Sequence, residues 1–363
     1  MTIKDISKSL KEIAHLHYAE DFDNVGLLTG EYDWECTGVL VTLDCLENTI
    51  DEAIARGCNM VVAFHPIIFS GLKNLQPSNY VKRTVVKAIK NDVAIYAVHT
   101  ALDNAYNGVS YRMAKSLGLK DIRTLIPRSG IIKKILFYVP QDYATQVQEA
   151  LYKVGAGELG NYSECSFTVQ GKGSFKGNQD SNPFTGEKNV RKLEDEAMVS
   201  LTYLPHLERE VLQALEKTHP YEQVAYEITT LENSYQNIGM GAIGELEQPL
   251  ESGAFLESLK TTFGTKIIRH TLSRKRNIQK IAVLGGSGAF GIQKAIAQKA
   301  DAYVTSDLKY HDFFLGADTL LCDVGHYESE QFTIDLIYDF LNAKFCNIAI
   351  FCAQAQTNPV NYY

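Results

Sequence analysis

The stretch Met60–Pro66, MVVAFHP, joins a short apolar run to an imidazole. The continuous apolar run Met60–Ala63 predicts a strand that is buried on both faces. His65 follows this strand directly, and strand ends are where open α/β sheets build their sites. Two other segments repeat the arrangement: Val93–Val98, followed by HTALD at 99–103, and Thr319–Val324, followed by GHYESE at 325–330.

The pattern outside the central region alternates strands and helices, which predicts an α/β fold with mostly parallel sheets. Gly57 is expected to end one of the helices as a C-cap. The expected strands are 38–44, 60–63, 93–98, 280–284, 302–306, 319–324 and 347–352, and the expected helices are 47–56, 81–91, 292–300 and 330–341.

The central region has a different order. Its expected elements are strand 133–139, helix 143–154, strands 164–170 and 197–204, helix 206–218 and strand 224–231, with a long mobile loop at 171–187. The order β-α-β-β-α-β is that of the ferredoxin-like α+β unit. We therefore expect one α/β unit of two lobes, formed by 1–128 and 246–363, with 129–245 inserted between them.

Composition excludes several classes of protein. The 363 residues carry 35 basic and 43 acidic side chains, a net charge of −8, so no nucleic-acid partner is expected, because that role needs a basic surface. No apolar run approaches the length of a membrane span and the N-terminus has no signal pattern, so no membrane partner is expected. The seven cysteines include no CxxC pair, which indicates free thiols and a cytoplasmic location.

Mixed histidine and carboxylate side chains suit Zn, Mn or Fe. His326 and Glu330 have i, i+4 spacing, which can place both on one face of a first helical turn; a surface ion pair or a helix cap is the alternative. His99 is a metal ligand, a donor that orients Asp103, or a substrate contact. His311, in the polar segment 307–311, belongs either to a shell around substrate or to an ordinary loop.

Two glycine-rich segments need separate interpretations. Gly239–Gly244 precedes no clear helix, and we interpret it as a hinge at the end of the inserted region. Gly286–Gly291 lies between a strand and a helix, with Asp307 about 20 residues further on, as in a dinucleotide-binding fingerprint. The same turn can instead hold a phosphate on its backbone N–H groups.

Taken together, the motifs resemble the GTP cyclohydrolase I type 2 homolog family, the Nif-three-like dinuclear-metal proteins. The two lobes that carry them cover about two-thirds of the chain. The inserted unit, which contains HPYE (219–222), looks like the CutA-like or PII-like domain of longer members. The matching motifs are DNVGL (23–27), FHPIIF (64–69), HTALD (99–103), GGSG (285–288), SDLKYH (306–311) and GHYESE (325–330).

The resemblance implies a ligand set. One metal would use His65, Asp103 and Glu330, and a second would use position 64, His326 and the shared Glu330. The family has two adjacent histidines before the proline, whereas this chain has Phe64 at the first position. Phe64 cannot bind a metal, so the second ion is expected to be weaker unless another histidine or water completes its shell. We expect one or two ions of Zn, Mn or Fe per chain.

The resemblance also implies a homohexameric ring and a GTP-opening activity. We therefore expect a metal-dependent hydrolase in which a metal-activated water attacks a nucleotide or related small substrate and His99 or His311 moves the proton. The alternative is a non-catalytic, metal-binding hexameric scaffold or sensor that binds an effector or partner through the inserted domain.

Overall fold

The computed structural model describes residues 1–272, 277–316 and 318–363. The chain divides into two compact units, one made of Met1–Pro127 with Gln236–Tyr363 and the other of Arg128–Tyr235. The first unit holds two sheets, each with its own core, and the second holds one. The boundary expected at residue 245 falls inside strand β10 (Ser234–Glu251).

The first sheet has the strand order β1-β4-β3-β2-β15. All its pairings are parallel except that of β1 with β4. Its parallel strands confirm the βα alternation that the apolar runs predict. The strands are β1 (Gly26–Thr29), β2 (Gly38–Thr42), β3 (Met60–Ala63), β4 (Ala94–Ala97) and β15 (Ala349–Cys352).

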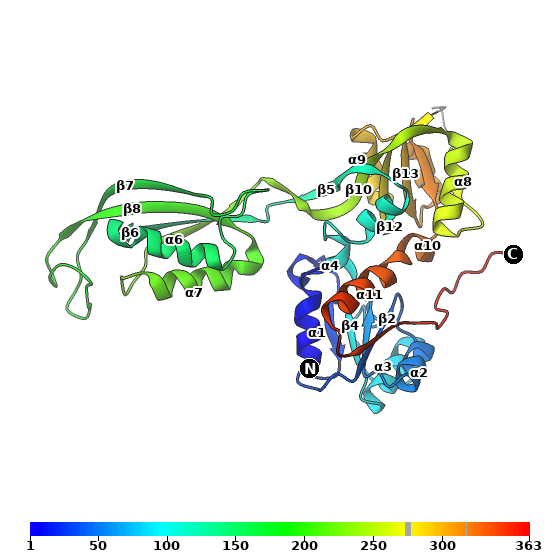
Figure 1. Ribbon diagram of the computed structural model, residues 1–363, viewed down its shortest axis with the longest axis horizontal. Coiled ribbons are helices and arrows are strands. Elements are labelled where there is room, and N and C mark those ends of the chain that lie inside the picture. The colour runs from blue at the N-terminus through cyan, green and yellow to red at the C-terminus, as the bar shows by residue number, and fades with distance from the viewer. Residues whose placement is uncertain (273–276, 317) are drawn as a thin grey trace. The chain divides into compact units, whose positions relative to one another are not determined.

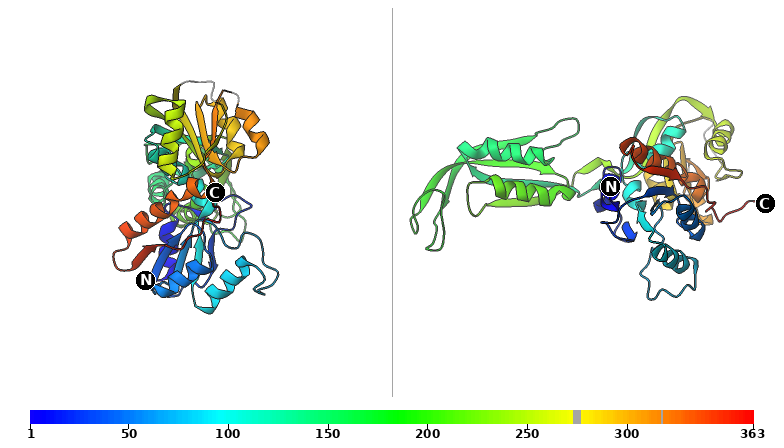
Figure 2. Two further views of the ribbon diagram at one scale, coloured as in Figure 1. Left: turned by 90° about the vertical axis from the view of Figure 1, so that its right-hand side faces the viewer. Right: turned by 60° about the horizontal axis from the view of Figure 1, so that its bottom comes forward.

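Helices cover both faces of this sheet (Figures 1 and 2). Leu40, Val61 and Ile95 belong to the core under α2 (Glu47–Ala55) and α3 (Tyr80–Lys90). The alternate residues of the same strands, among them Val39, Val62 and Tyr96, belong to the core under α1 (Ile3–Leu10) and α11 (Phe332–Lys344). Burial on both faces explains why these strands are continuously apolar.

The second sheet has the order β11-β14-β13-β12-β10-β5 and is mixed. The three central strands are parallel, but β10 and β11 pair antiparallel with their neighbours, so the expectation of a mostly parallel sheet is wrong here. Its strands are β5 (Lys120–Ser129), β10, β11 (Arg269–His270), β12 (Asn277–Ser287), β13 (Ala302–Ser306) and β14 (Leu320–Asp323), and its helices are α5 (Val109–Ser116), α8 (Ser252–Phe263) and α9 (Ile292–Ala297).

The segment Gly239–Gly244 is part of strand β10, so its interpretation as a hinge is wrong. The glycines are needed because β5 approaches closely. A Cβ on Gly239 would lie 2.1 Å from the carbonyl oxygen of Ile126. Gly239 and Gly241 also have φ angles of +151° and +73°, which other residues rarely adopt.

The second unit has the element order β-α-β-β-α-β. Its sheet is antiparallel with the order β7-β8-β6-β9, and Figure 1 shows α6 and α7 together on one face of it. Strand β7 runs to Phe175, so the loop predicted from 171 begins only at 176. The elements are β6 (Ile132–Pro140), α6 (Ala144–Lys153), β7 (Ser166–Phe175), β8 (Lys192–Tyr203), α7 (Glu208–Thr218) and β9 (Tyr226–Leu231).

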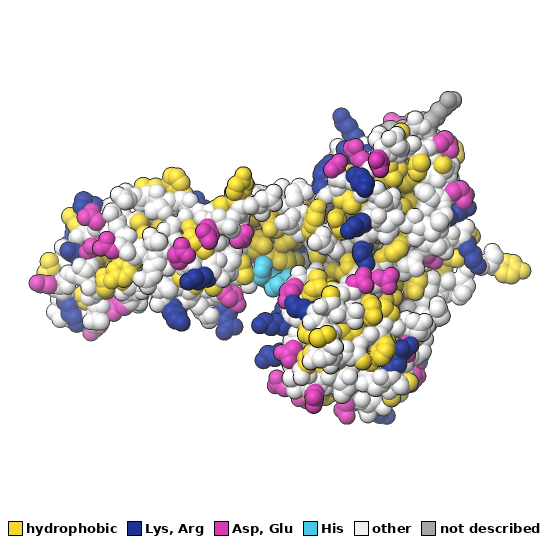
Figure 3. Space-filling view, in the orientation of Figure 1, with side chains coloured by type: hydrophobic (Ala, Val, Ile, Leu, Met, Phe, Trp, Pro, Cys, Tyr) yellow, Lys and Arg dark blue, Asp and Glu magenta, His cyan; other side chains and the backbone are white. Residues whose placement is uncertain are grey.

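Among the described residues, charged side chains form no large patch of one sign on the face that Figure 3 shows. On the face that Figure 3 shows, acidic and basic side chains are interspersed on each unit, in keeping with the composition. In the described part of the chain, no helix has the length and apolar character needed to cross a membrane. All seven cysteines are free thiols, and Cys36, Cys45, Cys58 and Cys322 are buried. Burial raises the pKa of the Cys36 thiol to about 11, which keeps it protonated and unreactive.

Candidate metal centre

The three polar segments singled out in the sequence all follow strands of the first unit. His65 lies two residues beyond β3, and β4 leads into the short helix α4 (His99–Asp103). Strand β14 leads through Gly325 into α10 (His326–Glu330). Gly325 has a φ of +97°, a conformation that glycine adopts without strain and that starts the helix immediately after the strand.

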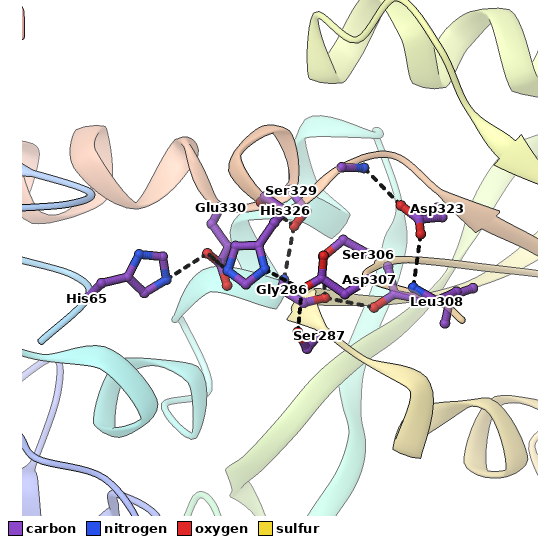
Figure 4. A network of polar contacts seen from close by, with 12 residues as sticks. His65, Gly286, Ser287, Ser306, Asp307, Leu308, Asp323, His326, Ser329 and Glu330 are labelled. Carbon is purple, nitrogen blue, oxygen red and sulfur yellow. Dashed lines mark hydrogen bonds and ion pairs between the residues drawn. The ribbon is translucent and has the colours of Figure 1, made fainter. Parts of the chain in front are cut away.

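His65, His326 and Glu330 converge on one point (Figure 4). Their potential ligand atoms lie within 4.8 Å of one another. The Nε2 atoms of His65 and His326 are each 3.1 Å from Oε2 of Glu330. Neither contact has hydrogen-bond geometry, and this buried oxygen has no hydrogen-bond partner among the described residues. A buried oxygen facing two imidazole nitrogens in this way is the arrangement that a shared cation satisfies.

A second carboxylate orients each of these imidazoles. Nδ1 of His65 lies 2.8 Å from Oδ1 of Asp44, and Nδ1 of His326 lies 2.7 Å from Oδ2 of Asp307. Thr357 donates to the other oxygen of Asp44 at 2.9 Å. An Nδ1–H that donates to a carboxylate leaves the Nε2 lone pair free for a metal, as is usual for metal-bound histidine.

His99 has the same kind of partner. Its Nδ1 lies 2.8 Å from Oδ1 of Asp23, and the second oxygen of Asp23 accepts from the backbone N–H of Thr100 at 3.0 Å. His99 and Asp307 adopt φ angles of +21° and +56°, which cost roughly 1–3 kcal/mol each and cluster at functional sites. His99 is thus fixed by Asp23 rather than by Asp103.

Gly286 makes room for Glu330. A Cβ on Gly286 would lie 2.2 Å from Oε1 of Glu330, and its φ is +67°. Its backbone N–H donates to Ser329 Oγ at 2.9 Å, beside Glu330 in the sequence. The glycine-rich turn that resembles a dinucleotide fingerprint therefore packs against a candidate metal ligand.

The charges at the centre are strongly coupled. Burial alone would lower the pKa of His65, but Asp44 and Glu330 outweigh it and raise the pKa to about 9. Asp307 and Glu330 raise the pKa of His326 to about 10. Burial would raise the pKa of Glu330, but the two imidazoles hold it at about 2. Burial and the negative Glu330 raise the pKa of Asp103 well above its ordinary value, and the two imidazoles only partly oppose that rise.

A cavity of about 820 Å³ opens over the centre. His65, Asp103 and Glu330 line it together with aromatic side chains, including those of Phe22 and Phe69. Phe64 is fully buried, with its ring centroid 4.9 Å from that of His65 and 5.5 Å from that of His99. A hydrocarbon ring therefore lies where the family resemblance places a second imidazole.

The structure brings most of the expected site residues together. His65, His326 and Glu330 form the cluster, and Asp103 and His99 line the same cavity. His311 does not line it: this residue is exposed on the 3-10 segment Tyr310–Gly316, with its ring against Tyr310 and Phe314. The orienting roles of Asp44 and Asp23 were missed, although Asp44 ends a predicted strand and Asp23 lies in a quoted motif.

The donor set of two imidazoles and buried carboxylates fits a divalent transition metal.

Comparison with known proteins assigns nearly the whole chain to one family. The profile of the Duf34/NIF3 (NGG1p interacting factor 3) family matches residues 1–359. A Bacillus subtilis relative named GTP cyclohydrolase 1 type 2 homolog is 35% identical over 353 residues, which cover 95% of this chain and 94% of the relative.

Solved structures support the same family assignment. A Bacillus cereus protein related to NIF3 is 32% identical, with a TM-score of 0.85, over 100% of this chain and 99% of the other. A Staphylococcus aureus structure is 28% identical, with a TM-score of 0.80 and the same coverage. The chain described here belongs to the Duf34/NIF3 family.

Proposed function

We propose that the chain binds a divalent transition metal, Zn, Mn or Fe, and acts as a metal-dependent hydrolase on a nucleotide or related small molecule. The observation that carries the proposal is the buried Oε2 of Glu330, which faces two oriented imidazole nitrogens at 3.1 Å and has no hydrogen-bond partner among the described residues. His65, His326 and Glu330 would hold the ion, with Asp103 from the same cavity.

The bound ion would supply Lewis acidity and a lowered pKa for a hydrolytic water. The chain's own residues supply positioning. Asp44 and Asp307 keep the two imidazoles in the tautomer that presents Nε2. His99, fixed by Asp23 at the cavity wall, is placed to hold or move a proton at its Nε2 atom.

The substrate class rests on the cavity and on the names of relatives. A volume of about 820 Å³ suits a nucleotide-sized molecule. Phe22 and Phe69 are both largely exposed at the cavity, and their ring centroids are 6.3 Å apart with the ring planes at 51°, so either ring offers an apolar face for a base. The relatives' name, GTP cyclohydrolase 1 type 2 homolog, makes GTP the first substrate to test.

Metal content and turnover test the proposal. Purified protein should contain a transition metal, or take one up from Zn, Mn or Fe(II), and Glu330→Gln should lose it. Glu257→Gln, at an exposed position of α8, is the matched control. An ion at 100 times its Kd should add about 2.7 kcal/mol of stability in chemical denaturation. GTP, other nucleotides and simple phosphodiesters should then be assayed on loaded protein; protein that takes up no metal contradicts the proposal.

A second candidate is the non-catalytic scaffold or sensor. The second unit has a cavity of its own, which favours effector binding there. Tight ligand binding without product on metal-loaded protein would support this function. We also propose a homo-oligomer, with a hexamer as the first expectation, because exposed aromatic side chains such as Tyr310 and Phe314 suit a covered surface. Light scattering tests it.

A further inference from the structure

The second unit contains a cavity of about 460 Å³ that the metal centre does not explain. Its floor is the sheet face opposite the helices. Ala197 and Val199 of β8 belong to the core under α6 and α7. Side chains alternate along a strand, so Glu194, Glu196 and Met198 point to the other face of the sheet. Loop residues 181–184 and the segment 221–223 complete the cavity.

Aromatic rings form the walls. Tyr221 is central, with its ring centroid 5.8 Å from that of Phe175 and 6.3 Å from that of Phe184. Phe184 also meets Tyr143 at 5.5 Å. The rings of Phe175, Phe184 and Tyr221 all line the cavity. Such a group of rings presents π faces that attract cations.

A buried carboxylate lies at the floor. Glu196 is 8% exposed, and its Oε1 accepts a hydrogen bond from the hydroxyl of Tyr221 at 2.8 Å. Its Oε2 lies beside Gly173, where a Cβ would be only 1.8 Å away. Glu194, next on the same face, has a buried Oε2 without a hydrogen-bond partner among the described residues. Glu194 has Lys192 as its ion-pair partner, whereas Glu196 has none among the described residues. A buried carboxylate without a countercharge is costly, which favours a cation beside Glu196.

The lysines nearby do not neutralise Glu196. Lys192 Nζ lies 3.7 Å from Glu194 Oε2, and Lys176 lines the cavity with an exposed side chain. Among the described residues, neither forms an ion pair with Glu196. The imidazole of His219, near the cavity in sequence, is not available as a metal ligand: Nε2 lies 2.8 Å from the carbonyl oxygen of Tyr138, and Nδ1 accepts from the Tyr221 backbone N–H. The described residues that line the cavity include no histidine or cysteine, so a transition metal has a poorer donor set here than at the metal centre.

We propose that this cavity binds a small organic cation with N–H donors, an alkylammonium or guanidinium group, between the rings of Phe175, Phe184 and Tyr221 and the carboxylate of Glu196. The N–H groups donate to the free oxygen of Glu196, and the alkyl part lies against the rings. The site is independent of the metal centre.

Isothermal titration calorimetry on the full chain tests this with four probes of one size: n-butylammonium, n-butylguanidinium, n-butanol and butyrate. The two cations should bind saturably, while the alcohol and the anion should not. N-acetyl-lysine amide distinguishes the source of the cation. Binding tighter than that of butylammonium identifies a peptide side chain as the ligand, and weaker binding identifies a free amine.

Matched variants test whether the cations bind in this cavity. Glu196→Gln should weaken the cations at least tenfold, since a charge-assisted hydrogen bond is lost. Gly173→Ala should weaken them because its Cβ displaces the carboxylate, whereas Gly171→Ala, with nothing within 4 Å, should not.

Phe184→Ala, at a half-exposed loop position where truncation should cost little stability, should weaken binding about threefold to tenfold. Phe167→Ala, at an exposed site outside the cavity, is its control. Absence of saturable heat with both cations overturns the proposal. So does butanol binding equal to that of the cations, or full affinity in Glu196→Gln and Phe184→Ala.

Discussion

Replacing Gly286 by alanine tests whether Glu330 needs the space beside this glycine. The new Cβ would lie 2.2 Å from Oε1 and 3.2 Å from Cδ of Glu330. A contact of 2.2 Å is not tolerated, so either the Glu330 carboxylate or the backbone at the end of β12 must move. Either shift takes Oε2 of Glu330 away from the imidazole nitrogens of His65 and His326. We expect metal affinity to fall by roughly 10- to 100-fold, the range found when groups supporting a metal ligand are changed.

Backbone strain must be separated from this effect. Gly286 has a φ of +67°, where alanine costs about 1–2 kcal/mol of folding stability. Gly264, at the C-terminal end of α8, has a φ of +65° and no atom within 4 Å of a Cβ. Gly264→Ala therefore carries the same backbone strain without a steric contact. Gly286→Ala should lose at least as much stability as Gly264→Ala, because the steric contact adds to the shared backbone strain, but only Gly286→Ala should lose metal affinity.

Chelator competition measures the affinity, and urea denaturation of the metal-free proteins measures the stability. The comparison is made between the two variants rather than with the parent chain, because their backbone strain is shared. If Gly286→Ala holds metal as tightly as Gly264→Ala does, Glu330 either is not a ligand or does not depend on the geometry described here.

Three further predictions concern other parts of the molecule. Phe64→His should raise metal affinity or stoichiometry by adding an imidazole beside His65; unchanged metal content by elemental analysis would contradict this. Replacing Arg128–Tyr235 by a short Gly/Ser linker should leave a folded, metal-binding first unit, because β5 and β10 are neighbours and Thr124 Oγ1 donates to the Gln236 carbonyl; circular dichroism and metal analysis check it. Burial lowers the pKa of His219 below its ordinary 6.5, so the stability that neutral His219 contributes is present above pH 6.5 and lost as pH falls below it. The second unit should therefore melt lower at pH 5 than at pH 7.5, and His219→Asn should flatten that difference.

The sequence predicts the parts of the fold that depend on local pattern. Strands β3 and β4 are short, continuous apolar runs, and β14 is apolar up to its last residue, Asp323; burial on both faces is the physical cause of that pattern. Strand β10 was not predicted, because its glycines have low strand propensity and look like a flexible segment. They are required by the close approach of β5 and by the positive φ angles of Gly239 and Gly241, which depend on contacts between distant segments that no local pattern contains.

The residues of the candidate site also fall into those that local pattern predicts and those that it does not. His65, His326 and Glu330 were predicted because each follows a recognisable strand. The orienting partners were not, because Asp44 and Asp23 meet their histidines across 21 and 76 residues. His311 was predicted from its place in a motif, but the 3-10 segment turns it out to an exposed position. A motif places a residue near a strand end, while the direction of its side chain depends on the loop.

The same reasoning bears on Phe64. Its ring is fully buried between β3 and the two imidazoles it contacts, so it is part of the core that fixes His65 and His99. An apolar ring at this position contributes no donor and excludes water from one side of the cluster. Without an imidazole at position 64, a second ion would find fewer protein ligands than the first. We therefore expect one tightly held ion and a weaker second position in the unmodified chain. Two ions at full occupancy that both resist mild chelation would contradict this, whereas Phe64→His should strengthen the second position.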